Sequence, residues 1–174
     1  MYKRQVTIIG GNFSYVEGQA RNVAIYDSES GSVKALTGAQ IEGVVRALFV
    51  QGDTLYVGGT FSLEGTQANG FAVYDLARGA WASDGIQPLQ PANGGAVAVR
   101  SISASESKDN TVIVAGTFAQ AGQLPCNAVC ALDTGSKQWN SFGSGIQGEV
   151  SGVAYSGVSI VVLPFLERSA NGAG

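Results

Sequence analysis

The fold is decided by a short segment that occurs three times, with the sequences YVGGTF at residues 56–61, IIGGNF at 8–13 and IVAGTF at 113–118. The phenylalanines that end these segments lie 48 and then 57 residues apart. A β-rich unit that recurs about every 40 to 50 residues is typical of a β-propeller blade. The segment therefore predicts a chain built of similar sheets.

Each copy continues with the same landmarks in the same order. Fourteen or fifteen residues after the phenylalanine an aspartate closes an apolar segment, and six residues later stands a valine or a tryptophan. Landmarks that keep their order over three copies indicate a structural repeat. The repeat positions that we assign are Gly10, Gly11, Phe13, Tyr26, Asp27, Gly58, Gly59, Phe61, Tyr74, Asp75, Trp81, Gly116, Phe118, Asp133 and Trp139.

Each copy contains four short segments rich in β-branched and aromatic residues, separated by Gly, Asp, Asn and Ser turns. No stretch keeps apolar residues at helical spacing for the length of a helix. The sequence thus predicts an all-β fold, a β-propeller fragment of about three four-stranded, kelch-like blades and the first strand of a fourth. Several apolar runs lack clean alternation, which indicates sheets buried on both faces.

The expected domain organisation is one partial propeller over residues 1–174. The blade units are 6–52, 53–110 and 111–157, followed by a degenerate fourth strand at 158–166 and a disordered tail at 167–174. In the fourth copy Phe165 stands 47 residues after Phe118, and the glycine pair is lost. Because propellers close with about four to eight blades, we expect the remaining blades of a longer parent propeller to be missing.

Composition excludes most catalytic classes. The 174 residues contain no histidine, so Ser-His-Asp and Cys-His nucleophiles and histidine-based metal sites are excluded. Two cysteines cannot complete a four-ligand zinc site, and a net charge of −3 disfavours nucleic acid. We expect no catalytic residue, no cofactor and no metal. The longest apolar run, 158–166, is too short to span a membrane, and no targeting segment is recognised.

The pattern also resembles known families. A glycine pair, then Tyr74, six residues and Trp81 is similar to a kelch repeat. The fuller pattern at 55–81, with PCNAVC at 125–130, resembles the fungal cortical-marker-for-cell-polarity family of large bud-site landmark glycoproteins. The resemblance covers the chain to about Val162. It implies a membrane-anchored cell-surface protein that marks growth or bud sites by binding other landmark proteins, without chemistry of its own.

Two candidate modifications follow from that resemblance. Asn12 begins an N-x-S/T acceptor, a motif expected about once by chance here, and otherwise serves as a strand-end residue that bonds backbone. The family's paired cysteines imply a Cys126–Cys130 disulfide. Residues four apart in a strand lie about 13 Å apart, so a bridge requires the chain to fold back at 125–128. The alternative is two free thiols.

The recurring charged and aromatic residues have structural explanations. One aspartate per blade suits turn capping and cannot form the close carboxylate pair of glycosidases. Arg46 and Arg100 recur, and we expect both to be solvated. The aromatic positions are expected to pack between blades. The leading hypothesis is a non-enzymatic scaffold that binds proteins at the cell surface. The alternatives are an intracellular kelch-type adaptor or a glycan-binding propeller lectin.

Overall fold

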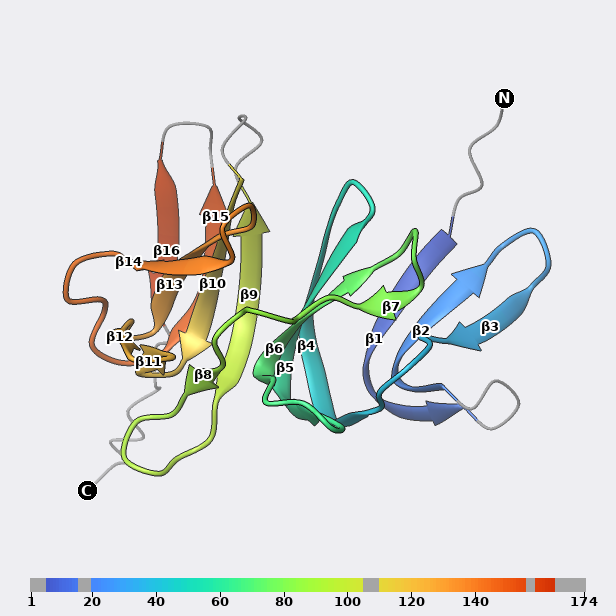
Figure 1. Cartoon of the computed structure of the whole chain (residues 1–174), viewed down its shortest axis with the longest axis horizontal. Coiled ribbons are helices and arrows are strands. Elements are labelled where there is room, and N and C mark those ends of the chain that lie inside the picture. The colour runs from blue at the N-terminus through green and yellow to red at the C-terminus, as the bar shows by residue number, and fades with distance from the viewer. Residues whose placement is uncertain (1–5, 16–19, 105–109, 156–158, 165–174) are drawn as a thin grey trace, which may run out of the picture.

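The computed structural model describes residues 6–15, 20–104, 110–155 and 159–164, and within these ranges the regular structure is entirely β (Figure 1). The strands form antiparallel sheets that follow one another across the molecule, from the first sheet beside the N-terminus to the last hairpin beside the C-terminus. The all-β class and the partial propeller predicted from the repeat are confirmed.

The strand bounds are as follows. The first sheet contains β1 (Val6–Tyr15), β2 (Ala20–Asp27) and β3 (Ser32–Ala35). The second contains β4 (Ile41–Gln51), β5 (Thr54–Leu63), β6 (Asn69–Asp75) and β7 (Ala80–Trp81). The third contains β9 (Ala98–Ala104), β10 (Thr111–Thr117), β13 (Val129–Asp133) and β14 (Gln138–Ser141). The fourth is the hairpin β15 (Val150–Tyr155) and β16 (Ile160–Pro164). A small sheet combines β8 (Leu89–Gln90), β11 (Gln120–Ala121) and β12 (Leu124–Pro125).

The sheets are out of phase with the sequence repeat. β4 ends the unit predicted at 6–52, yet it pairs with β5 of the following unit. β9 pairs with β10 and β15 with β16 in the same way. A repeat unit therefore supplies three strands of one sheet and the first strand of the next. The predicted fourth strand at 158–166 contains β16, and the tail at 167–174 lies outside the described residues.

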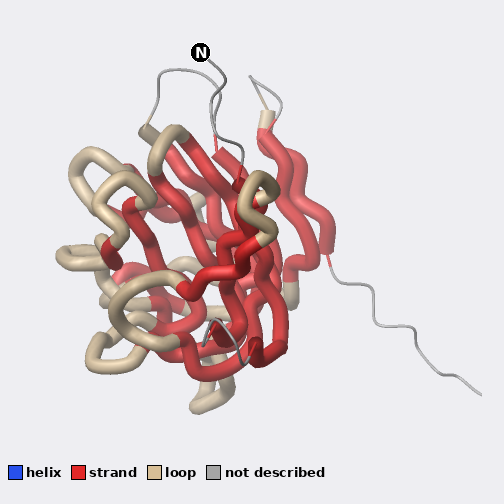
Figure 2. The backbone as a smooth tube through the Cα atoms, turned by 90° about the vertical axis from the view of Figure 1, so that its right-hand side faces the viewer, coloured by secondary structure: helices blue, strands red, loops and turns tan. Residues whose placement is uncertain are grey.

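Every sheet interface has its own apolar core. Successive sheets lie side by side in Figure 1, so that they stand one behind another when the molecule is viewed from the side of the first sheet (Figure 2). Leu55 and Val57 on β5 belong to the core shared with the first sheet, whereas Tyr56 belongs to the core shared with the third. Because alternate side chains of one strand point to opposite faces, β5 is buried on both sides. This explains the continuous apolar runs.

A close approach of two backbones explains the second glycine of the motif. In the second sheet Gly59 pairs with Val45, next to a register shift that leaves Arg46 unpaired. A Cβ atom at Gly59 would collide with the carbonyl oxygen of Val44, and one at Gly116 would collide with that of Ala98. Only glycine fits beside such a bulge.

Candidate interaction surfaces

Neighbouring sheets meet through a recurring contact in which a valine on the first strand of one sheet stands over a glycine of the preceding sheet. A Cβ at Gly10 would lie 2.8 Å from Val45 Cγ1, and a Cβ at Gly58 would lie 2.5 Å from Val99 Cγ1. Both distances are too short for real carbon atoms, so a side chain at either glycine would push the next sheet away.

The third interface keeps this arrangement with one change. Ala115 occupies the position of Gly58 and is fully buried in a core with Val150 and Val153 of β15. We call the position held by Gly10, Gly58 and Ala115 the small-residue position. A short side chain there is what lets the next sheet approach.

The fourth sheet departs from the pattern. In β16, Leu163 pairs with Gly152 next to the bulge, just as Gly58 pairs with Ala47 next to the bulge of the second sheet. A leucine therefore occupies the small-residue position of β16. Leu163 is 58% exposed and Val161 is 49% exposed. The matching residue to Val161 is Tyr56 in the second sheet, 4% exposed, and Ile113 in the third, 1% exposed. The outer face of the β15–β16 hairpin is therefore apolar and uncovered, and it is not shaped to receive another valine.

The first sheet also has an uncovered apolar face. Among the described residues no sheet precedes the first one, whereas this face of the second and third sheets is covered by the sheet before it. Ile9 is 41% exposed, although Val57 and Val114 at the same position are completely buried. Apolar side chains thus remain exposed at both ends of the row of sheets.

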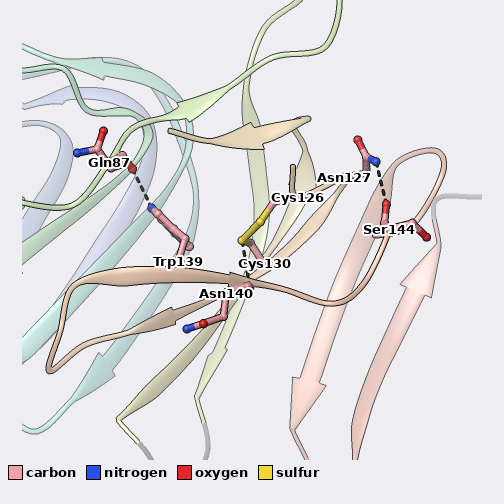
Figure 3. Close-up of a disulfide and its surroundings, with 7 residues drawn as sticks. All are labelled: Gln87, Cys126, Asn127, Cys130, Trp139, Asn140 and Ser144. Carbon is pink, nitrogen blue, oxygen red and sulfur yellow. Dashed lines mark hydrogen bonds between the residues drawn. A yellow bond between two sulfur atoms is a disulfide. The ribbon is translucent and has the colours of Figure 1, made fainter. Parts of the chain in front are cut away.

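Two tryptophans fasten the segments that connect the sheets. Trp81 Nε1 donates a hydrogen bond to the Ala39 carbonyl oxygen over 2.9 Å, and Trp139 Nε1 donates to that of Gln87 over 2.8 Å (Figure 3). Trp81 packs edge-on against Tyr74 with ring centres 5.1 Å apart. In each case the tryptophan holds the connecting segment that leads from the previous sheet towards its own sheet, between β3 and β4 for Ala39 and between β7 and β8 for Gln87, which is a packing role.

A disulfide joins Cys126 to Cys130, and both side chains are fully buried (Figure 3). Their Cα atoms lie 5.4 Å apart because the chain folds back between them, where Ala128 adopts a φ of 62°. Asn127 Nδ2 donates to the Ser144 carbonyl oxygen over 2.9 Å. The small sheet that supports this loop has strands of two residues, too short to give a sequence signal.

The recurring aspartates end their strands as turn caps. Asp133 Oδ1 accepts hydrogen bonds from the backbone N–H groups of Gly135 and Ser136, at 2.9 and 2.8 Å. These bonds favour the ionised form and lower the pKa of the Asp133 carboxyl. Asp75 accepts in the same way from the backbone N–H groups of Ala77 and Arg78, and Asp27 accepts from that of Glu29. Each carboxylate is engaged in its own turn.

The two recurring arginines, Arg46 and Arg100, differ in their surroundings. Arg46 is exposed, as expected. The expectation for Arg100 is wrong, because its half-buried guanidinium Nη2 lies 3.0 Å from Glu149 Oε2. Glu149 immediately precedes β15, so this ion pair ties the third sheet to the fourth. Sequence reasoning missed it because Glu149 has no counterpart in the other units.

The remaining predictions concern the glycosylation motif, metal binding and membrane spans. Asn12 is exposed on β1, on the stretch where the register between β1 and β2 shifts. Across the described ranges, His, Cys, Asp and Glu side chains nowhere gather in threes as a metal ion would need. No helix long and apolar enough to cross a bilayer occurs in that same part of the chain.

Comparison with known proteins gives a consistent result. The family described as the Rax2 C-terminal beta propeller domain matches residues 71–163. "Polarized growth protein L1" of a Phoma species is 31% identical over 158 residues, 86% of this chain and 12% of the relative. "Polarized growth protein RAX2" of Candida albicans is 27% identical over 144 residues, 77% of this chain and 10% of the relative. The chain spans about a tenth of the length of these relatives. The kelch-like detail stays a prediction.

Proposed function

Because this chain belongs to the Rax2 C-terminal β-propeller family, we propose that it is a non-enzymatic scaffold segment that acts at sites of polarized growth by binding other proteins. Its curated relatives carry the name polarized growth protein and come from fungi. The family resemblance described above extends the proposal to the outer face of the cell, at growth or bud sites.

The observation that carries this proposal is the uncovered apolar face of the β15–β16 hairpin. Val161 and Leu163 are exposed there, while the same face of the two preceding sheets is buried by the next sheet. Exposed apolar patches on a packed protein mark places where another surface docks. Since Leu163 fills the small-residue position, that surface differs from an ordinary blade of this repeat.

The proposal that the chain is not an enzyme is supported by its composition and by the hydrogen bonds of its recurring aspartates. The chain has no histidine, and its recurring aspartates bond their own backbone turns. A catalytic role would require reactive groups that converge on one point, as in an acid–base pair.

An extracellular location is supported by the disulfide. Disulfides persist in oxidising compartments and are rare in the cytosol. Peptide mapping of native protein after alkylation without reduction tests this location. We expect Cys126 linked to Cys130, and a glycan on Asn12 would add to the argument. Two alkylated thiols would instead support the intracellular adaptor.

The binding role is tested in the parent gene of the fungus. The double variant Val161→Glu/Leu163→Glu places two carboxylates on the apolar face, and we expect growth sites to be misplaced while the parent protein still reaches the cell surface. Val50→Glu is the matched control, because Val50 is 46% exposed at the end of β4, in a complete sheet. Correct growth sites in the double variant would contradict the proposal, as would the same defect in the control.

A further inference from the structure

A cavity of about 310 Å³ lies beside the second sheet, apart from the end faces described above. It is lined by the β5–β6 turn, which includes Thr66 and Gln67, and by the segment after β7, which includes Ser83 and Asp84. Trp81 and Phe71 contribute aromatic rings to the lining. The volume is at the small end of ligand sites, about 300 to 1,000 Å³.

Among the polar side chains of this lining, those of Gln67 and Asp84 have hydrogen-bonding groups that no group of the described residues satisfies. Gln67 and Asp84 are exposed, and in the described part of the chain their side chains have no hydrogen-bond partner. The Thr66 hydroxyl, by contrast, donates to the Leu63 carbonyl oxygen and accepts from the Ala68 N–H. A ligand would thus meet an amide, which both donates and accepts, and a carboxylate, which accepts.

The charge of the site favours a neutral ligand. Lys137 Nζ donates to the backbone oxygen of Asp84 over 2.6 Å, which brings one positive charge close to the rim of the cavity. No arginine or lysine belongs to the cavity lining, which disfavours phosphate. The indole of Trp81 adds a half-buried apolar surface held in place by its bond to Ala39. Neutral hydroxyls paired with planar polar groups and C–H faces packed on an aromatic ring are the chemistry of sugars.

We propose that this cavity binds a neutral sugar residue of a glycan. Gln67 and Asp84 hydrogen-bond the hydroxyl groups, and the ring lies against Trp81. The site is small enough to take the end of an oligosaccharide rather than a long chain. This inference rests on the cavity and is independent of the protein-binding role proposed above.

The test is a titration of the ¹⁵N-labelled full chain with soluble oligomers of glucose, of N-acetylglucosamine and of mannose. We expect at least one of them to shift the amide signals of residues 65–68 and 83–87 in a saturable manner. Gln67→Ala or Asp84→Ala should weaken that binding about tenfold, the effect of losing one good hydrogen bond. Gln90→Ala is the matched control, because Gln90 is an exposed glutamine outside the cavity, and it should change the affinity less than twofold (about the experimental error).

Thermal unfolding of each variant shows whether it is folded, so that lost binding can be assigned to the site. Three results would overturn the proposal. They are the absence of saturable shifts with all three sugars, shifts that persist unchanged in both cavity variants, and shifts confined to other parts of the chain. Each would leave the proposed scaffold role standing, since that role is tested on the β15–β16 face.

Discussion

Filling the small-residue position should force neighbouring sheets apart, and the interface at Gly58 gives the clearest case. A Cβ there would lie 2.5 Å from Val99 Cγ1, and 3.0 Å from Ile102 Cδ1. Overpacking of this kind costs about 1 to 3 kcal/mol, so Gly58→Ala should lower the free energy of unfolding by that amount. Val99→Ala removes two buried methyl groups at about 0.8 kcal/mol each, and the cavity raises the loss to about 2 to 3 kcal/mol.

The combination of the two substitutions is the decisive measurement. In Gly58→Ala/Val99→Ala the new methyl group enters the space left by Val99 Cγ1, and the nearest atoms are then Ile102 Cδ1 at 3.0 Å and residue 99 Cβ at 3.1 Å. We therefore expect the double variant to be more stable than the sum of the single effects by about 1 kcal/mol or more.

Guanidinium unfolding followed by both circular dichroism and tryptophan fluorescence measures these free energies, provided that the two transitions coincide. Gly11→Ala serves as the control, because its Cβ would lie 3.5 Å from the Phe13 ring, an ordinary contact. Losses that add within about 0.5 kcal/mol in the double variant would refute a direct contact between positions 58 and 99.

Three further predictions concern the connections and turns. Trp139→Phe removes the donor to the Gln87 carbonyl and should lower the free energy of unfolding by about 1 to 2 kcal/mol in the same assay, and an unchanged midpoint would contradict the anchoring role. Replacing both Cys126 and Cys130 by serine opens a short loop and should cost about 2 kcal/mol, which equal stability of the oxidised and substituted proteins would disprove. Asp133→Ala should destabilise the protein at about pH 7, and this effect should shrink as the pH falls below the usual pKa of an aspartate, because the lowered pKa of Asp133 gives stability that is present above its usual pKa and lost as the pH falls through the lowered value; a pH-independent difference in unfolding would refute this.

The roles of several recurring residues could be predicted from residue types at fixed spacing. The tryptophans were expected to pack, the aspartates to cap turns, and the chain to fold back before Cys130. Those features depend on a few neighbouring residues. The Arg100–Glu149 ion pair joins two sheets through a residue that is absent from the repeat, so no sequence period indicates it.

The cavity and the uncovered β15–β16 face were also beyond sequence reasoning. Gln67 and Asp84 stand 17 residues apart on two loops whose sequences have no motif, and only the path of the backbone brings them to one cavity. Aligning the fourth copy by Phe165 places Val162 at the small-residue position, whereas the strand pairing places Leu163 there. A one-residue slip turns every side chain to the opposite face, so the register must be observed.

That the chain is all-β and built of repeats could be predicted from its amino-acid sequence. Those properties follow from turn residues, apolar runs and glycines that recur at a fixed interval. Which strands share a sheet, where one sheet approaches the next, and which apolar face stays uncovered became visible only in the folded molecule. Strand pairing and sheet packing join residues tens of positions apart, and their geometry is set by backbone hydrogen bonds and close contacts that a linear pattern does not encode.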